Sequence, residues 1–562
     1  MVEAVTRQSA PLLPVYLGLP PKFSNFRAQQ LDKALDIWTS DKRFQALDAS
    51  PGTGKSLLYM AVAKLEGEGK RTLILTATKG LQRQVTADFS ASGLREIKGQ
   101  SNYRCVALDV GGVLEGYGAP GSTCAEGPCK VGVRCHLRDG GCTYFDEIKY
   151  ARESPIVIDN YAHWMALGKY SDPTTLGEFD MLVLDECHEA PDWLTDFASV
   201  DLSAAEVKKL LNEELPALDV GVDTWASWAR RAAFVASARQ RQLRGEMKEC
   251  GRAHKQQYTK QLLRLSALER DLTQMGQARE WRRTDDATKQ VDVPGGVTDW
   301  IAYETPKGAK FTPVWAHQYA EQYLFRGIKK IVLSSGTLMP SLLKRLGIDP
   351  SKCDWHTVSS SFDPKRRPVY YWPATRVDQK MTEGQRRLWM NVNDVIVGER
   401  LDVKGIIHSV SYDRAYEIKR RSKYGDVMLT HGRDNLREVV EEFRRAKPPC
   451  VLVSPSVTQG WDFPGDACRY IVIPKVPFAS ATDPLFKARC QADKNHRFEC
   501  AALVIIQESL RGMRSAEDWL EVFITDEHFG YMRSKLEWMS WFKAAWKQID
   551  SMPVSLKTRL AA

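Results

Sequence analysis

Short apolar runs, rather than long amphipathic repeats, mark the first third of the chain. The runs are Phe44–Asp48, Thr72–Thr76, Ile156–Ile158 and Met181–Leu184, and Leu57–Leu65 between the first two has helical spacing. Continuous apolar runs of this length are typical of parallel strands that are buried on both faces of a sheet. The pattern therefore predicts an α/β domain built on a parallel sheet.

A second series of such runs begins after Pro368. Helical patterns separate its members, so a second parallel sheet is predicted. The aromatic-rich end of the chain, Phe529–Lys547, is predicted to be helical and to pack against this sheet. The strand candidates are Lys404–His408, Val427–Leu429, Cys450–Ser454, Tyr470–Pro474 and Glu521–Thr525.

Two long segments interrupt the first domain. Residues 99–150 hold five of the twelve cysteines, many glycines and little strand pattern, so they are predicted to form an inserted module. Residues 203–282 have helical periodicity and precede the next strand candidate, Lys330–Leu333. This second insertion is predicted to consist of long helices that break near Gly245 and Gly251.

Composition is that of a soluble globular protein with several domains. The chain has 562 residues, of which 43% are apolar and 27% charged, and this length allows roughly three to five domains. No apolar run is long enough to span a bilayer, and residues 1–14 lack the apolar core of a secretion signal. We therefore expect a cytoplasmic protein that is not secreted and does not enter a membrane.

The net charge of the chain is compatible with nucleic-acid binding but does not require it. The formal net charge is +9, and basic residues gather between Arg230 and Arg264. A basic helix of this kind serves equally well as a solvated face or as a surface for phosphates. In a reducing compartment, clustered cysteines are typical of a metal or iron–sulfur site rather than of disulfides.

A phosphate-binding loop follows the first apolar run. In the sequence ASPGTGKS, at positions 49–56, Gly52 and Gly54 allow a tight turn that aims backbone N–H groups at phosphate oxygens. Lys55 supplies a positive charge for the β- and γ-phosphates, and Ser56 supplies a hydroxyl ligand for Mg²⁺. The strict pattern has glycine where this chain has Ala49. The strand–loop–helix context makes a chance glycine-rich turn the weaker interpretation.

An acidic pair follows the last apolar run of this half. Asp185 and Glu186 lie in the sequence DECH at the carboxyl end of a predicted strand, where open α/β sheets bind ligands. Asp185 is expected to hold Mg²⁺ through water, and Glu186 is expected to orient the attacking water. A surface acidic turn is the alternative, but the phosphate loop in the same half favours the catalytic interpretation.

Two arginines in the second half add the remaining element of phosphoryl transfer. Arg511 and Arg514 stand three positions apart in the sequence QESLRGMR, which places them on one face of a predicted helix. Guanidinium groups that arrive from the second sheet would stabilise charge on the γ-phosphate, so hydrolysis would depend on closure of the two domains. Taken alone, such a pair is also common on protein surfaces.

Eight short sequences occur in the order found in superfamily two helicases of the XPD/DinG type, and the chain resembles that family over roughly residues 20–530. The family carries an iron–sulfur domain and a helical arch, and both predicted insertions fall at the corresponding places. The eight sequences are FRAQQ, ASPGTGKS, TATKGLQRQ, IDNYAHWM, DECH, LSSGTL, SVTQGWDFPG and QESLRGMR.

The resemblance implies a fold class and a division of the chain. The fold class is α/β, with two RecA-like parallel-sheet motor domains, the first of which carries a small cysteine-rich insertion and a helical arch insertion. The implied divisions are motor domain 1 at 1–98, 151–195 and 311–365, the iron–sulfur domain at 99–150, the arch at 196–310, and motor domain 2 with C-terminal helices at 366–562.

The resemblance also implies roles for individual residues. The nucleotide is expected to be ATP, and Mg²⁺ is assigned to Ser56 and Asp185. The residues assigned to hydrolysis are Lys55, Asp185, Glu186, His188, Arg511 and Arg514. The residues assigned to nucleotide binding are Arg27, Gln30, Gly52, Thr53, Gly54, Lys55, Ser56, Gly460, Asp462 and Gln507.

The cysteine-rich insertion offers five thiols where a 4Fe–4S cluster takes four. The spacings of the last four suit zinc as well, and from the residues alone the two occupants are comparable. The resemblance favours the 4Fe–4S cluster, in a structural role in a domain that acts as a wedge at the DNA fork. The ligands it implies are Cys105, Cys129, Cys135 and Cys142, with Cys124 as the surplus cysteine.

The resemblance implies an ATP-dependent 5′–3′ DNA helicase that acts on single-stranded and forked DNA. Tyr103 and Tyr161 are candidates for stacking on bases, and the basic arch for tracking phosphates. A translocase that remodels protein–DNA or R-loop complexes without unwinding stays open, as does an RNA-directed helicase. The intact motor residues disfavour a binding module with a degenerate ATPase. We expect a monomeric motor in a bacterial cell or a phage-infected host, with replication, repair or defence proteins as candidate partners.

Overall fold

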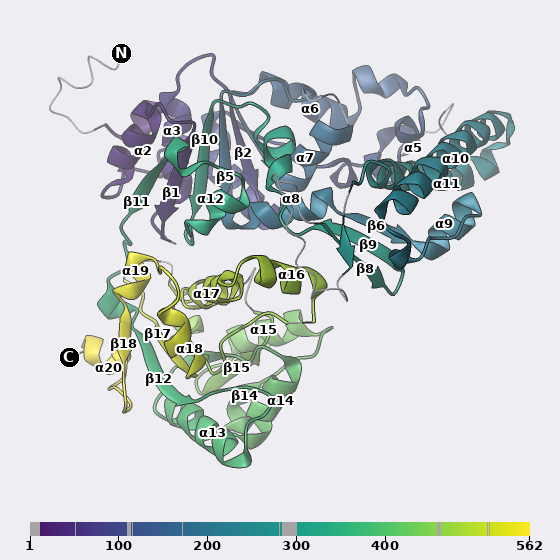
Figure 1. Ribbon diagram of the computed structural model, residues 1–562. Helices are drawn as coiled ribbons and strands as arrows, with labels where there is room; N and C mark the ends of the chain where they lie inside the picture. Colours follow the sequence, from purple (N-terminus) through teal and green to yellow (C-terminus); the bar gives the residue numbers. More distant parts are fainter. Residues whose placement is uncertain are drawn as a thin grey trace.

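The computed structural model describes residues 12–561 with short gaps and contains two seven-stranded sheets, one above the other in Figure 1. A smaller four-stranded sheet lies near the base of a pair of long helices. None of the described helices is both long enough and apolar enough to cross a membrane. The positions outside the description are 1–11, 51, 110–113, 115, 171, 173, 280, 284–299, 458–460, 462, 481, 514, 516 and 562.

The first sheet is entirely parallel, in the order β11–β1–β10–β5–β2–β4–β3. The predicted parallel sheet is therefore confirmed, and every apolar run that was expected to form a strand does so. The edge strands β3 and β11 were not predicted. The strands are β1 (Phe44–Ala49), β2 (Thr72–Thr76), β3 (Leu94–Glu96), β4 (Ile156–Asn160), β5 (Met181–Asp185), β10 (Lys330–Ser335) and β11 (Cys353–Val358).

Alternate residues of the central strands enter two separate cores, which explains the continuous apolar runs. On β2, Ile74 packs with helices α2, α3 and α4, while Leu73 and Leu75 pack with helices α7 and α8. Because neither face of the strand meets water, it needs no polar alternation. The helices are α2 (Gln30–Thr39), α3 (Lys55–Leu65), α4 (Lys79–Phe89), α7 (Tyr161–Tyr170) and α8 (Ala190–Ala198).

The second sheet is also entirely parallel, in the order β14–β15–β13–β16–β17–β12–β18. All five strands predicted in this half are present, and β12 and β18 are additional. Helix α13 (Glu383–Gly398) packs against β12 and β17. The strands are β12 (Val369–Thr375), β13 (Lys404–His408), β14 (Met428–Leu429), β15 (Cys450–Ser454), β16 (Tyr470–Ile473), β17 (Glu521–Asp526) and β18 (Trp546–Gln548).

The helical prediction for Phe529–Lys547 is wrong in part. The segment forms two short helices, α18 (His528–Arg533) and α19 (Ser540–Lys543), and then enters β18. The rings of Phe529 and Trp546 lie 5.7 Å apart, whereas a straight helix would separate these positions by roughly 25 Å. The chain therefore folds back so that its aromatic side chains form one cluster beneath the second sheet.

The cysteine module forms short helical turns and, among its described residues, no strand. This agrees with the weak strand pattern of residues 99–150. Its last helix, α6, leads directly into β4 of the first sheet. The elements are α5 (Val106–Asp109), η5 (Cys124–Glu126), η6 (Pro128–Val131), η7 (His136–Asp139) and α6 (Thr143–Glu153).

Two long helices form the second insertion, as predicted, and lie side by side at one end of the molecule in Figure 1. Helix α10 (Val222–Glu249) passes through Gly245 without a break, so the break expected there is wrong, whereas Gly251 separates it from α11 (Arg252–Met275). The base of this arch includes a sheet that was not predicted. Its strands are β6 (Val200–Ser203), β7 (Arg282–Arg283), β8 (Trp300–Thr305) and β9 (Gly308–Pro313).

The arch touches both the cysteine module and the second lobe. Arg244 Nε on α10 donates a hydrogen bond to Val131 O at 3.3 Å, and Lys255 Nζ on α11 lies 4.7 Å from the ring centre of Tyr117. Arg489 on α16 (Pro484–Ala492) donates a hydrogen bond to Val314 O, which directly follows β9. The inserted modules therefore form a continuous structure with the two sheets.

Candidate nucleotide site and cysteine module

The phosphate loop joins β1 to α3 in the geometry that its sequence predicts. Gly52 and Gly54 have φ values of 81° and 78°, in the left-handed region that favours glycine. Thr53 Oγ1 donates a hydrogen bond to Ser50 O at 2.7 Å, which tightens the turn. Lys55 is the first residue of α3, and Ser56 follows it. The loop thus places both side chains at a helix N-terminus, where phosphate binding is favoured.

Side chains from elsewhere in the chain brace the loop. Gln30 Nε2 on α2 donates to Thr53 O at 2.6 Å, and Arg27 Nη1 donates to Gly52 O. A Cβ on Gly54 would lie 2.5 Å from Gln30 Nε2, and a Cβ on Gly52 would lie 2.1 Å from the ring of Phe362. Both glycines are therefore required by close packing as well as by backbone conformation.

The predicted carboxylates lie at the end of strand β5, which β10 separates from β1. Lys55 Nζ is 3.3 Å from Glu186 Oε1. The hydroxyl of Tyr59 donates to Asp185 Oδ2 at 3.3 Å, and the hydroxyl of Tyr161 donates to Asp185 O at 3.0 Å. Glu186 itself has φ 49°, an uncommon conformation for a non-glycine residue that turns the chain sharply after the strand. The structure thus brings the lysine and both acids together.

Opposing effects set the pKa values in this buried cluster. Burial lowers the pKa of Lys55, but Glu186 and Asp185 outweigh burial, so the pKa is raised and the ammonium stays charged. Burial, aided by Glu186, raises the pKa of Asp185 to about 7. Burial acts on Glu186 in the same direction, but Lys55 and His188 outweigh it, and the pKa of Glu186 is lowered. Lys55 therefore stabilises the ionised form of Glu186, and Asp185 needs a further cation to stay ionised.

His188 connects this cluster to the second lobe. Gln507 Nε2, on α17 (His496–Glu508), donates to His188 Nε2 at 3.0 Å, so the ring proton is assigned to Nδ1. His188 Nδ1 then donates to Ser335 Oγ at 3.0 Å, at the end of β10. The same nitrogen is 3.4 Å from Glu186 Oε2. A group of the second lobe thus reaches the acidic pair through one imidazole ring.

The expected helix face with two arginines is wrong. Helix α17 ends at Glu508, and Arg511 lies in the turn that follows. Arg511 Nη1 donates to Trp461 O at 2.7 Å, while its buried Nε has no hydrogen-bond partner among the described residues. Arg514, Gly460 and Asp462, which were also assigned to this site, lie outside the described residues.

All five clustered cysteines line one small void of about 10 Å³. Cys105 and Cys124 are buried, whereas the other three are partly exposed. Cys124 Sγ lies 3.4 Å from Arg104 O. A hydrogen bond from the Cys124 thiol lowers the pKa of Cys142 to about 6, despite the opposing effect of burial. The surplus cysteine of the sequence therefore lies inside the cluster rather than apart from it.

A larger cavity, of about 680 Å³, lies where the cysteine module, the arch and the first sheet meet. Lys79, Lys130 and Arg270, one from each of these three parts, line it. His163 also lines it, and its Nδ1 is 2.9 Å from Asp159 while its Nε2 is 3.2 Å from Tyr144 OH. We call this cavity the junction cavity. Its basic side chains suit an anionic chain.

Comparison with known proteins gives two family matches and a shared fold. Residues 24–214 match the family described as "Type III restriction enzyme, res subunit", and residues 406–545 match the family described as "Helicase C-terminal domain". A solved XPD helicase ("XPD_Helicase") has a TM-score of 0.58 at 14% identity, over 93% of this chain and 99% of that chain. Residues 406–545 are therefore a helicase C-terminal domain, and the chain has the fold of XPD helicases.

The chain shares its fold with a further solved structure of this kind. Xpd4 of S. tokodaii has a TM-score of 0.55 at 14% identity, over 93% of this chain and 100% of that chain. No curated protein matches the chain. The matched helicase C-terminal domain supports a helicase-type ATPase, and the shared fold confirms the two RecA-like domains.

The donor groups present suit the ligands of such a helicase. Asp185 has a raised pKa that a bound cation would lower, and Ser56, which directly follows Lys55, supplies a hydroxyl. These oxygen ligands suit Mg²⁺ bound together with ATP. Five thiols around one void suit an iron–sulfur cluster or zinc. Among the described residues, no group of three or more His, Cys, Asp or Glu side chains is arranged to hold a metal ion.

Sequence reasoning missed several contributors to the nucleotide site. Tyr59 lies one helical turn after Lys55, and this spacing of four was the available signal. The ring of Phe362, which lies against Gly52, comes from the segment that joins the two sheets, so only the fold reveals it. Tyr161 was proposed to stack on bases, but it is buried and its hydroxyl donates to Asp185 O. The stacking role proposed for Tyr161 is therefore wrong.

Proposed function

We propose that the protein is an ATP-dependent 5′–3′ DNA helicase that translocates on single-stranded DNA and separates duplex at a fork. The observation that carries this proposal is the junction cavity, which three separate parts of the chain surround with one basic side chain each. A single strand presents both phosphates and unstacked bases to such a cavity. The direction and the choice of DNA follow from the resemblance to XPD/DinG helicases.

In this proposal the nucleotide site works by charge placement. Lys55 binds the β- and γ-phosphates, and Glu186 orients the attacking water, held in place by Lys55 and His188. Mg²⁺, held by Ser56 and Asp185, would neutralise phosphate charge. Arg511, whose buried Nε has no hydrogen-bond partner among the described residues, would bind the γ-phosphate when the lobes close. The residues that hold the phosphate loop and the two lobes in place are Arg27, Gln30, Gly52, Thr53, Gly54 and Gln507. The proposal also keeps Gly460 and Asp462 in nucleotide binding and Arg514 in hydrolysis.

We also propose that the cysteine module holds a 4Fe–4S cluster on Cys105, Cys129, Cys135 and Cys142. The supporting observation is that all four line the same void. Cys124 would then serve as a hydrogen-bond donor to Cys142 rather than as a ligand. Such a cluster would supply cross-links that a short-turn module of this size lacks, and its thiols require a reducing, cytoplasmic compartment.

The division of the chain follows from the same proposal. The domains would be motor domain 1 (1–98, 151–195 and 311–365), the iron–sulfur domain (99–150), the arch (196–310) and motor domain 2 (366–562). A single copy contains the whole junction cavity and both sides of the nucleotide site, so the motor is proposed to act as a monomer.

A strand-separation assay tests the proposal. Anaerobically purified protein is mixed with forked DNA carrying either a 5′ or a 3′ single-stranded tail, with a matched forked RNA, and with ATP. We expect unwinding of the 5′-tailed DNA only, and none with Lys55→Ala. Unwinding of the RNA fork alone, or of the 3′-tailed DNA alone, would refute the substrate or the direction. DNA-stimulated ATP hydrolysis without strand separation would indicate a remodelling translocase.

A further inference from the structure

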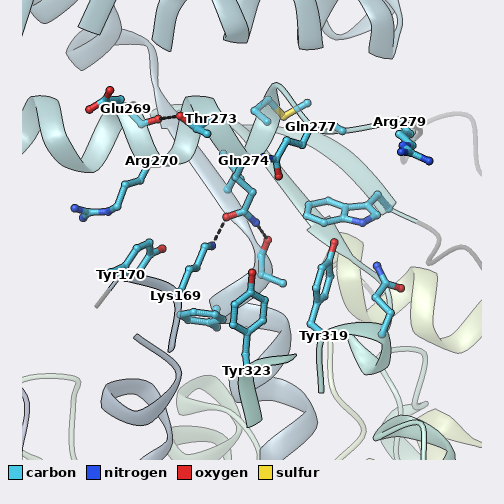
Figure 2. A pocket seen from close by; sticks show the side chains of 17 residues that line it. Lys169, Tyr170, Glu269, Arg270, Thr273, Gln274, Gln277, Arg279, Tyr319 and Tyr323 are labelled. Carbon is cyan, nitrogen blue, oxygen red and sulfur yellow. Dashed lines mark hydrogen bonds between the residues drawn. The ribbon is translucent and has the colours of Figure 1, made fainter. Parts of the chain in front are cut away.

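A second cavity, of about 550 Å³, lies at the foot of the arch, next to the junction cavity. Helices α7, α8 and α11 and strand β8 contribute to its walls, together with η10 (His317–Tyr319) and η11 (Ala320–Phe325). Figure 2 shows its side chains pointing toward a common space from several directions. Its volume is within the usual range for small-molecule sites, about 300–1,000 Å³. We call it the foot cavity.

A row of four aromatic rings runs along the foot cavity. The ring centres of Tyr170 and Phe197 are 6.1 Å apart, those of Phe197 and Tyr323 are 5.2 Å apart, and those of Tyr323 and Tyr319 are 6.2 Å apart. None of the four is fully buried, and Tyr170 is 47% exposed. Rings that only filled a core would be enclosed, so this row offers faces to something that enters the cavity.

Cationic groups accompany the row at both ends. Arg270 Cζ lies 4.8 Å from the ring centre of Tyr170, and Lys169 Nζ lies 4.8 Å from that of Phe197. Lys169 Nζ also donates to the side chain of Gln274, whose amide donates to Ala198 O, so the lysine is held in place. Arg279 lines the opposite end, as Figure 2 shows. A fixed cation beside an aromatic face suits a ligand that is both planar and anionic.

The foot cavity and the junction cavity share two lining residues, Tyr170 and Arg270. A ligand that leaves the junction cavity past these side chains therefore meets the aromatic row next. This continuity favours a chain that occupies both cavities over a separate small molecule, because the two spaces share one wall.

We infer that the foot cavity binds a nucleotide of the single strand that passes through the junction cavity, with its base against the row Phe197–Tyr323–Tyr319 and its phosphate near Arg270 and Lys169. Base stacking on aromatic rings accepts any base, which a translocating motor requires. This inference rests on the proposed function and deepens it, because it extends the strand path beyond the junction cavity. A free mononucleotide has the same chemistry, and the experiment separates the two sources.

The test measures affinity against strand length. Fluorescence anisotropy is recorded for labelled oligothymidylates of about 4 to 24 nucleotides with the wild-type protein and with the double variant Tyr319→Ala, Tyr323→Ala. We expect equal affinity for the shortest strands that bind, and roughly a tenfold loss for strands long enough to reach the foot cavity. Tyr323→Phe, which keeps the ring, should retain the affinity of the wild type.

Phe234→Ala is the matched control, because Phe234 is an aromatic residue of the arch that is 70% exposed on α10 and lies outside both cavities. Thermal unfolding of each variant checks the fold. An unchanged length dependence in the folded double variant would overturn the inference. Binding of thymidine monophosphate that is as tight as strand binding and is lost in the double variant would also overturn it. Failure of the wild-type protein to bind any strand would refute the proposed function instead.

Discussion

Glu508 is predicted to make the protein less stable as the pH rises toward 8. Its side chain is buried at the end of α17, with His408 Nδ1 of β13 at 3.3 Å and Arg511 nearby. Burial raises its pKa from 4.5 to about 8, against the opposing effect of Arg511. The folded protein thus keeps a proton that the unfolded chain releases, and the loss of stability begins near pH 4.5 and ends near pH 8.

The size of this effect follows from the width of the interval. Each pH unit is worth about 1.4 kcal/mol, so the loss attributable to Glu508 reaches about 5 kcal/mol at pH 8. His408 acts in the opposite direction, because burial lowers its pKa from 6.5 to about 3 and stability therefore rises with pH up to 6.5. The two slopes cancel between pH 4.5 and 6.5. The pair together should contribute a net decline mainly from pH 6.5 to 8, of about 2 kcal/mol.

Glu508→Gln replaces the protonated acid by a neutral side chain of the same shape. Thermal unfolding, followed by tryptophan fluorescence at pH 5, 6.5 and 8 and constant ionic strength, should show that the variant is increasingly more stable than the wild type as the pH rises. Glu214→Gln is the control, because that side chain is 82% exposed, and its pH profile should match the wild type. Parallel profiles for Glu508→Gln and the wild type would show that Glu508 is ionised in the fold, as an ion pair with His408, and would refute the reasoning.

Three further outcomes are expected. Lys55→Ala should reduce DNA-stimulated ATP hydrolysis by about 10²–10³-fold while single-strand binding, measured by anisotropy, stays within twofold; retained hydrolysis would remove Lys55 from the site. Gln507→Ala should lower the hydrolysis rate by roughly tenfold, since one hydrogen bond to His188 is lost. Gln507→Glu should not restore the rate, because a carboxylate cannot donate a hydrogen bond to His188 Nε2. A hydrolysis rate equal to that of the wild type would show that the contact has no role in closure. Serine variants of the five cysteines should fall into two groups when the visible absorbance of anaerobically purified protein is measured. The iron–sulfur band should be lost in the variants of Cys105, Cys129, Cys135 and Cys142 and retained in Cys124→Ser. Equal bands in all five variants, or zinc in place of iron, would refute the ligand assignment.

The parts of the fold that the sequence predicts are those in which each strand is apolar over its whole length. β2 and β15 are buried on both faces, so their composition alone distinguishes them. Strands of the arch sheet escape prediction because β6 alternates buried and exposed residues over only four positions. The edge strand β3 has three residues, and no periodicity is measurable over such a length.

The candidate site shows the same division between local and distant information. The positions of Lys55, Asp185 and Glu186 follow from strand–loop–helix sequences that are contiguous in the chain. The turn after Glu508 is instead fixed by contacts with distant residues, because Phe463 N donates to Arg511 O and Arg511 Nη1 donates to Trp461 O. A helical pattern in the sequence carries no information about such a contact. The prediction that Arg511 lies on a helix face was therefore wrong.

Helix α8 links the nucleotide site to the other features of the molecule. It begins four residues after Glu186 and is nine residues long, so in the proposed motor a shift of the acidic pair would be passed to the whole helix. Arg489 of the second lobe donates hydrogen bonds to the exposed Asp192 and to the buried Thr195 of this helix. Near its far end, Phe197 lies in the aromatic row, and Ala198 O accepts the bond that orients Gln274. Under the proposed function, closure of the lobes around ATP would therefore act on the foot cavity through this one short helix, and so connect hydrolysis with movement of the strand.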